Sequence, residues 1–214
     1  MCCRYYMELS PELRPIVEAA AASRLYRDNI EKLAKPLVTE GEVFPDSLVP
    51  VIASTKSGKR TVFPMVWGYH VDGISRLIAN ARAETAAEKP TFRDGWALHR
   101  CIVPASWYYE WEHLPTAGGK TRAGDKYAIM PAGSRLTLLC GLYRMENGYP
   151  HFVILTREPG EKLAAIHDRM PLILSEADAE SWIDPKINPY ALLAASLTDM
   201  VAERVESGAG ARQR

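Results

Sequence analysis

The chain has 214 residues, of which 47% are hydrophobic and 24% are charged. A chain of this length and composition can bury a core of its own, so disordered, collagen-like and coiled-coil architectures are excluded. Twenty-six Lys and Arg residues balance twenty-six Asp and Glu residues. Because there is no bulk positive charge, a nucleic-acid partner must be recognised by a local patch.

The N-terminal region and the longest apolar runs argue against a membrane partner. Glu8, Glu12 and Glu18 interrupt the alanines near the N-terminus, so this region lacks the uninterrupted apolar stretch of a signal peptide. The apolar run over 136–142 is far too short to cross a bilayer. The cysteines lack C-x-x-C spacing, which indicates reduced thiols rather than disulfides or a structural zinc site. We therefore expect a cytoplasmic protein.

The first predicted helix covers residues 11–34. Ser10 is the expected N-cap and Pro11 the first helical residue, and apolar residues follow at helical spacing. Pro15 and Ser23 are positions where this helix can bend or split.

Short runs rich in β-branched and aromatic residues dominate the middle of the chain. The predicted strands cover 49–54, 61–69, 76–81, 100–112, 126–131, 136–144 and 150–156. The segment 118–124, rich in Gly, Lys and Arg, is expected to be an exposed hairpin loop.

Helices return near the C-terminus. A short helix begins after Pro159 and ends before Pro171, Ser175 caps a helix that runs through Trp182, and a further helix is expected over 189–205. Strands that follow one another through turns favour an antiparallel sheet or barrel. We therefore predict an α+β fold with a barrel-like antiparallel core and flanking helices.

The predicted domain organisation is one domain over 1–205. The glycine- and arginine-containing segment 206–214 is expected to be a disordered tail.

Cys2 offers unusual chemistry if Met1 is removed. The α-amine and the thiol of a terminal cysteine both titrate near pH 8, so a useful fraction of each is deprotonated at neutral pH. The amine can condense with an aldehyde to an imine, and the thiol can then close a five-membered thiazolidine on the imine carbon. No other residue type can form that ring.

Several short motifs occur in a characteristic order from Cys2 onwards. They are Met1-Cys2-Cys3-Arg4, Trp67-Gly68, Asn80-Ala81-Arg82-Ala83-Glu84-Thr85, Trp107-Tyr108-Tyr109-Glu110-Trp111 and His167-Asp168-Arg169-Met170-Pro171. Together they resemble the SRAP family, the SOS response-associated peptidase proteins. The resemblance implies a DNA-repair protein whose terminal Cys2 forms a covalent thiazolidine link with the ring-opened aldehyde of an abasic site in single-stranded DNA.

The implied chemistry requires proton transfer, because an abasic sugar must open its ring and the carbinolamine must lose water. Glu110 is the candidate acid and base, since burial among aromatic rings raises a carboxyl pKa. The resemblance places Asn80 in the active site, where its amide can hold the Cys2 amine. His167 lies in a family motif and can hydrogen-bond the sugar oxygen or move its proton.

DNA binding requires cations for the phosphates. Arg4, Arg82 and Arg169 lie inside the motifs and are expected to line the path of the strand, and Thr156 can add a hydroxyl contact. Structural ion pairing is the competing role for both arginines, with Glu84 as the expected partner of Arg82 and Asp168 as that of Arg169.

The sequence departs from the family pattern at two places. Position 3 is commonly Gly in the family and is Cys3 here, and no second tryptophan follows Trp67-Gly68 to wedge against bases. Trp67 is therefore expected in the core, as are Cys101 and Cys140, which lie within apolar strand patterns.

Three readings of function remain open at this point. The first is abasic-site capture, with removal of Met1 as the peptidase activity and imine formation as lyase-type chemistry. The second is a thiol or N-terminal-nucleophile hydrolase in which His167 serves Cys2 as base. The third is a noncatalytic nucleic-acid-binding module. No metal or organic cofactor is indicated, a monomer is expected, and the first reading predicts association with the nucleoid during repair.

Overall fold

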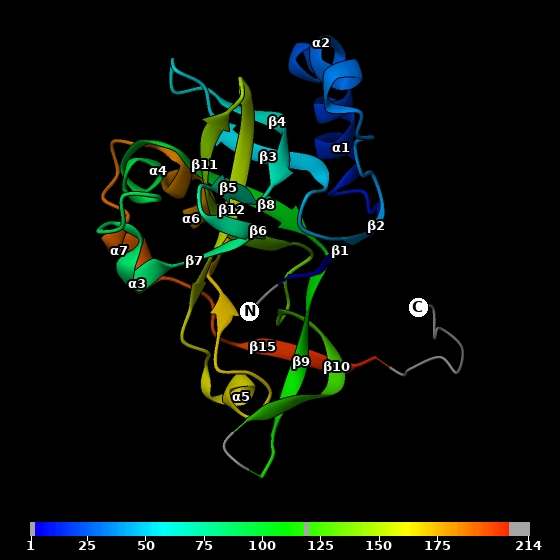
Figure 1. The fold of residues 1–214 in the computed structure, drawn as a ribbon, viewed down its shortest axis with the longest axis vertical. Coiled ribbons are helices and arrows are strands. Elements are labelled where there is room, and N and C mark those ends of the chain that lie inside the picture. The colour runs from blue at the N-terminus through cyan, green and yellow to red at the C-terminus, as the bar shows by residue number, and fades with distance from the viewer. Residues whose placement is uncertain (1–2, 118–119, 206–214) are drawn as a thin grey trace.

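The computed structural model describes residues 3–117 and 120–205. A closed barrel of five strands lies at its centre (Figure 1). Around the barrel the strands are paired in the order β12 (Tyr149–Arg157), β4 (Arg60–Trp67), β3 (Leu48–Ser54), β8 (Arg100–Ala105) and β11 (Thr137–Glu146). The additional pairing of β11 with β12 closes the ring. Only the β12–β4 contact within this ring is parallel.

The alternation of side chains along these strands divides the core into an inner and an outer part. All five strands contribute to one buried cluster, including Val51, Trp67, Val103, Leu139 and Phe152. Because successive side chains point to opposite faces of a strand, the neighbours of these residues face outwards. Helices cover this outer surface, so the apolar strand patterns are buried on both sides.

The buried positions confirm three expectations about the core. Trp67 is completely buried, and its indole nitrogen donates to the Ala79 carbonyl oxygen at 2.9 Å. Cys101 and Cys140 are also completely buried, and burial raises the pKa of each thiol. These two cysteines are therefore inert packing residues.

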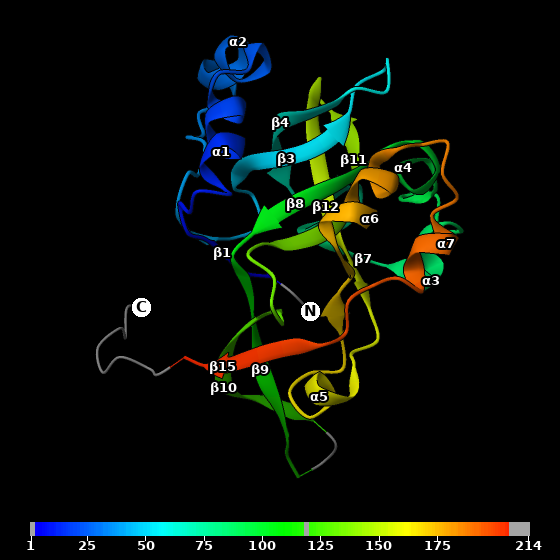
Figure 2. The ribbon, with the colours of Figure 1, turned by 180° about the vertical axis from the view of Figure 1, so that it is seen from behind.

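A second sheet lies beyond one end of the barrel (Figures 1 and 2). Its strands are antiparallel in the order β15 (Met200–Arg204), β10 (Thr121–Pro131), β9 (Trp107–Pro115), β1 (Tyr5–Met7) and β2 (Gly41–Val43). Tyr5, Tyr108 and Ile129 of this sheet belong to the inner core cluster. The two sheets therefore share one core.

Five smaller strands complete the β-structure of the described residues. They are β5 (Tyr69–Val71), β6 (Ile74–Ile78), β7 (Asn80–Arg82), β13 (Met170–Pro171) and β14 (Ile173–Leu174), the last of which pairs with β11. β5 and β6 form a separate hairpin, whereas β7 and β13 both pair with the end of β12.

Seven helices flank the sheets in the described part of the chain. They are α1 (Arg14–Ala21), α2 (Arg24–Leu33), α3 (Ala83–Ala86), α4 (Arg93–Leu98), α5 (Glu161–Ala164), α6 (Glu176–Ile183) and α7 (Tyr190–Leu193). The predicted α+β class with an antiparallel, barrel-like core is confirmed. No helix among the described residues combines the length and apolar character needed to cross a bilayer.

The first predicted helix differs from the observed structure at its start and its middle. The Ser10 hydroxyl accepts from the Leu13 backbone nitrogen at 3.2 Å and so stabilises a turn, and α1 begins only at Arg14. Ser23 accepts from the Tyr26 nitrogen at 3.1 Å and caps α2. The chain therefore splits at Ser23, where a hydroxyl provides a new N-cap.

Two other predictions are corrected by tertiary pairing. The helix expected over 189–205 is wrong beyond α7, because Met200–Arg204 forms a strand that pairs with β10 along its whole length. The strand expected over 100–112 is divided at Ser106, whose backbone nitrogen donates to the Tyr6 oxygen. This break lets the chain leave the barrel as β8 and enter the second sheet as β9.

The expected hairpin loop is shorter than 118–124, since Thr121 already belongs to β10. Residues 118–119 lie outside the described residues, as does the expected tail 206–214. The helix after Pro159 and the helix capped by Ser175 are confirmed as α5 and α6.

Candidate active site

Glu110 is placed on β9 by the crossing from the barrel to the second sheet. β9 pairs on one side with β1, where the Tyr109 nitrogen donates to the Arg4 oxygen at 2.9 Å, and on the other with β10, where Tyr127 stands opposite Glu110. Glu110 is 4% exposed. Burial raises its pKa to about 7, because removing the carboxylate from water disfavours its charged form.

His167 approaches the same carboxyl group from the segment between α5 and β13. Its Nε2 lies 3.6 Å from Glu110 Oε2, and both side chains are 5% exposed. The Arg169 backbone nitrogen donates to His167 Nδ1 at 3.0 Å, and Asp168 Oδ1 lies 2.9 Å from the same ring nitrogen. Burial lowers the pKa of His167 to about 4, so the imidazole is neutral at neutral pH.

Asn80 lies next to the N-terminal segment of the chain. β7 runs parallel to β12 with Asn80 opposite Ile154, and this register places the Asn80 side chain near Cys3. Asn80 Nδ2 donates to Cys3 Sγ at 3.9 Å, a sulfur hydrogen bond. Burial, with a further effect of the nearby Glu110 charge, raises the pKa of the Cys3 thiol. Cys2 lies outside the described residues.

Three of the predicted catalytic residues therefore come from three separate elements and meet at one place. Asn80 contacts Cys3, Glu110 influences the Cys3 thiol, and His167 contacts Glu110. Cys3 directly follows Cys2 in the sequence.

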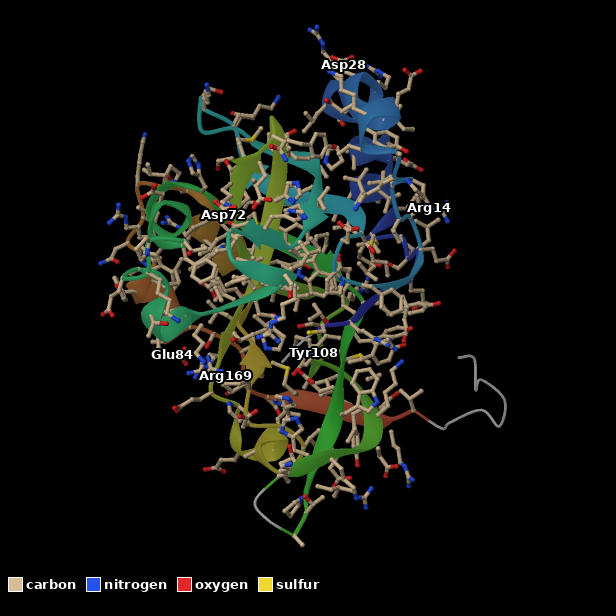
Figure 3. All side chains as sticks on the ribbon, in the orientation of Figure 1. Arg14, Asp28, Asp72, Glu84, Tyr108 and Arg169 are labelled. Atoms are coloured by element: carbon tan, nitrogen blue, oxygen red, sulfur yellow. The ribbon has the colours of Figure 1, made fainter. Side chains whose placement is uncertain are left out.

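Arg82 and Arg169 lie on opposite sides of the end of β12. Arg82 on β7 stands opposite Thr156, its side chain is exposed, and the described residues offer it no ion pair. Arg169 instead forms a two-point ion pair with Glu84 at 2.8 Å through each nitrogen, and it donates to the Thr156 carbonyl oxygen at 2.7 Å. Figure 3 shows Glu84 and Arg169 side by side.

These contacts change what the sequence indicated about ion pairing. The competing structural role proposed for Arg169 is present, but its partner is Glu84 rather than its neighbour Asp168. The Thr156 side chain is 1% exposed, and its hydroxyl donates to the Ala81 oxygen at 3.4 Å. The structure therefore gives this hydroxyl a partner within the protein, between β12 and β7.

Arg4 lies on a surface of cations and aromatic rings beside Glu110. Its guanidinium carbon is 4.7 Å from the Phe44 ring centroid and 5.1 Å from that of Trp111. Lys126 lies 3.7 Å from the Tyr109 ring centroid. Both cations also pair with Glu42, so this surface combines positive charge, aromatic rings and one carboxylate.

Sequence reasoning missed Lys126 and His113 as neighbours of the site, and it paired Glu84 with Arg82 rather than with Arg169. Lys126 stands opposite Trp111 across the β9–β10 pair, a register that no motif encodes. His113 follows the aromatic motif by two residues, and its ring centroid lies 3.9 Å from that of His167. Glu84 belongs to the motif that begins at Asn80, and this was the sequence signal that it lies near the site.

One group of residues at this site has the composition of a metal site. His113, His167 and Asp168 present ligand atoms that lie within 4.8 Å of one another. Asp168 is largely exposed, and exposed acidic groups commonly occur without an ion. The buried pair Glu110 and His167 can carry proton transfer without such an ion, because a carboxyl with a pKa near 7 can both donate and accept at neutral pH.

The fold and this site define a barrel protein with a buried carboxyl–imidazole pair beside its N-terminal segment. The family model of SOS response associated peptidase (SRAP) matches residues 1–209. The chain belongs to the SRAP family.

Curated relatives share this region. The chain is 40% identical over 118 residues to the abasic site processing protein YoaM of Bacillus subtilis, covering 53% of this chain and 50% of that protein. It is 29% identical over 133 residues to the abasic site processing protein YedK of Escherichia coli, covering 58% and 56% respectively. The matched region thus spans about half the length of these relatives.

Solved structures share the fold over nearly the whole chain. A phage-related protein from Bordetella bronchiseptica superposes with a TM-score of 0.71 at 22% identity, covering 98% of this chain and 96% of the other. A protein from Bacteroides thetaiotaomicron gives a TM-score of 0.71 at 21% identity, covering 96% and 92%. At such identities the likeness establishes the fold alone.

Proposed function

We propose that this protein captures abasic sites in single-stranded DNA through Cys2, after Met1 has been removed. The observation that carries the proposal is the meeting of Asn80, Glu110 and His167 at the segment that begins with Cys3. The names of the curated relatives, abasic site processing proteins, support the same substrate.

The proposed reaction begins with a closed abasic sugar. Opening of the ring frees an aldehyde, the Cys2 amine adds to the aldehyde carbon, and loss of water from the carbinolamine gives an imine. The Cys2 thiol then adds to the imine carbon, its proton passes to the nitrogen, and the thiazolidine ring closes. The net change is condensation of the amine, the thiol and the aldehyde with release of one water molecule.

Each buried group has a distinct part in this sequence. Glu110, with a pKa raised to about 7 by burial, donates a proton to the departing hydroxyl group and takes it back in the next step. His167 is neutral and accepts or donates a hydrogen bond at the sugar oxygen. Asn80 positions the reacting terminus without adding charge.

The remaining proposed roles concern the DNA. Arg4 and Arg82 contact phosphates, while Arg169, held by Glu84, supports the segment that carries His167. Thr156 stabilises the pairing of β12 with β7 through the hydrogen bond that its hydroxyl donates to the Ala81 oxygen. A monomer in the cytoplasm that joins the nucleoid during repair fits this role, and removal of Met1 is its peptidase step.

The test uses single-stranded DNA in which uracil has been converted to an abasic site by a glycosylase. After incubation with the full chain, a denaturing gel should show a slowly migrating covalent band. Cys2→Ser should abolish the band, whereas Cys3→Ser should retain it, because the nitrogen of Cys3 is acylated and cannot form the ring. This pair of variants is closely matched, since the two cysteines are adjacent.

Three outcomes would refute the proposal. A band of equal intensity in Cys2→Ser would remove Cys2 from the chemistry. An acyl-enzyme formed with a peptide substrate, without any DNA adduct, would favour the hydrolase, and reversible DNA binding alone would favour the binding module.

A further inference from the structure

A second cluster of ligand-type side chains lies on the barrel, away from the candidate active site. It consists of His70 on β5, Glu146 at the end of β11 and His151 on β12. One ring nitrogen from each histidine and one carboxylate oxygen lie within 4.8 Å of one another. No local spacing in the sequence predicts this cluster, because His70 and Glu146 are 76 positions apart.

The two oxygens of Glu146 have different partners. Arg144 holds Oε1, with Nε at 2.8 Å and Nη2 at 2.7 Å. Oε2 faces the histidines, at 2.9 Å from His70 Nδ1 and 3.6 Å from His151 Nδ1. One oxygen is thus oriented by an arginine, and the other converges with two imidazoles.

Arg144 is itself held in place by two further contacts. Its guanidinium carbon lies 4.4 Å from the Tyr69 ring centroid, and its Nη2 also donates to the His70 backbone oxygen at 2.5 Å. A metal-ligating carboxylate commonly has an outer partner of this kind, which fixes its orientation.

The charges around the cluster are balanced. Lys35 pairs with Asp46, whose charge acts on His151, and Arg144 pairs with Glu146. A neutral imidazole and an ionised carboxylate are the forms in which these two residue types bind metal.

Two of the three separations between the ligand atoms are close to those of a tetrahedral zinc site. Tetrahedral bonds of roughly 2.0–2.1 Å place neighbouring ligand atoms about 3.4 Å apart, and the observed separations from Glu146 Oε2 are 2.9 and 3.6 Å. The His70 side chain is 67% exposed and can adjust. His151 Nδ1 lies 3.0 Å from the Gly68 oxygen, a contact that coordination through this nitrogen would replace.

We propose that His70, Glu146 and His151 form a binding site for a borderline divalent transition-metal ion, with Zn²⁺ as the preferred ion. Two imidazole nitrogens and one carboxylate oxygen suit Zn²⁺ and disfavour Mg²⁺ and Ca²⁺, which require mostly oxygen ligands. Water completes the coordination at the exposed side of His70.

The site would join two hairpins. His70 belongs to the β5–β6 hairpin, whereas Glu146 and His151 flank the turn between β11 and β12. β6 ends at Ile78, two residues before Asn80. A bound ion therefore tethers to the barrel the hairpin that leads into β7, and it should raise the thermal stability of the protein.

Binding is measured on the full chain after treatment with a chelator, by zinc competition against a chromogenic chelator and by the visible spectrum of Co²⁺. We expect one site with tetrahedral Co²⁺ bands and without the intense thiolate charge-transfer band that cysteine ligands would give. His70→Ala should weaken zinc binding at least about tenfold and abolish the zinc-dependent rise in melting temperature, since even outer-shell changes cost about tenfold or more. Glu146→Gln should have a similar effect.

His113→Ala serves as the matched control, because His113 belongs to the other histidine group. Zinc affinity of this variant should equal that of the parent. The proposal is overturned if His70→Ala and Glu146→Gln bind zinc as tightly as the parent, if only His113→Ala loses binding, or if the Co²⁺ spectrum shows thiolate ligation. None of these results depends on whether DNA is captured.

Discussion

The carboxyl oxygen of Glu110 and the Nε2 of His167 lie 3.6 Å apart, and burial shifts their pKa values in opposite directions. Burial raises the pKa of Glu110 to about 7 and lowers that of His167 to about 4. This reverses the usual order for the two residue types, so a proton present between these values resides on the carboxyl group. The pair provides a neutral acid beside a neutral imidazole, as dehydration of a carbinolamine requires.

Replacing Glu110 with Gln should slow adduct formation by about 10²–10⁴, the usual contribution of a positioned acid or base. DNA binding should persist, because Gln keeps the size of the side chain. The rate of the parent should follow a bell-shaped pH profile, limited at low pH by the protonated Cys2 amine and at high pH by ionised Glu110. Quenched time courses on denaturing gels at several pH values measure both effects.

The informative part of that profile is its alkaline limb. In Glu110→Gln the decline above about pH 7 should disappear while the acid limb remains. An unchanged rate and an unchanged alkaline limb would remove Glu110 from the mechanism.

Glu110→Gln should also change how stability depends on pH. Folding raises the Glu110 pKa from the ordinary 4.5 to about 7, so the folded state holds a proton that the unfolded state has lost between these values. The stability of the parent therefore declines through this window as pH rises. The variant, always neutral, should be more stable than the parent by roughly 3–4 kcal/mol at pH 8, since one pKa unit is worth about 1.4 kcal/mol.

Denaturant unfolding at pH 8 and near pH 4 measures this difference. The gap between the two proteins should vanish near pH 4, where the glutamic acid is protonated in both states. His167 has the opposite pH dependence, but both proteins contain it, so its effect cancels in the comparison. A variant that is less stable at pH 8 would contradict the raised pKa.

Arg82→Ala should weaken binding to single-stranded DNA and reduce the salt dependence of log K by about 0.7, the change for one lost phosphate contact. Arg82 is suited to this contact because it is exposed on β7 and has no ion pair among the described residues. Fluorescence anisotropy at several salt concentrations gives the slope. Arg60→Ala, which removes a partner of Glu180 on another part of the barrel, should leave it unchanged.

Arg169→Lys should destabilise the fold, because lysine cannot make the two-point contact with Glu84 and also reach the Thr156 oxygen. We expect a loss of about 1–2 kcal/mol, the cost of leaving a nearly buried hydrogen-bonding group unmatched. Chemical denaturation measures it. Arg24→Lys, at an exposed pair with Asp28, should have no measurable effect on the free energy of unfolding. Equal losses of stability in the two variants would show that the Arg169 contacts stabilise the fold no more than an exposed ion pair does.

Local patterns in the sequence were sufficient to predict most of the strands of the barrel. The strands near 49–54, 136–144 and 150–156 follow continuous β-branched and apolar runs, which are typical of strands buried on both faces. The C-terminal strand Met200–Arg204 could not be predicted in this way, because its conformation is set by pairing with β10. The same holds for Tyr5–Met7, which is a strand only between its two partners.

The candidate site shows the same division between local and tertiary information. Asn80, Glu110 and His167 could be selected because each lies in a recognisable motif. The ion pair between Glu84 and Arg169 could not, since it depends on how β7 and β13 flank β12. Ligand clusters drawn from distant strands, such as His70 and Glu146, likewise require the closed barrel.

The most direct test of the central claim is mass spectrometry of the covalent product after proteolysis and nuclease digestion. We predict that the sugar remnant is attached to a peptide that begins at Cys2 and lacks Met1. A remnant on Cys3, on a lysine or on a peptide that retains Met1 would contradict capture through a terminal aminothiol.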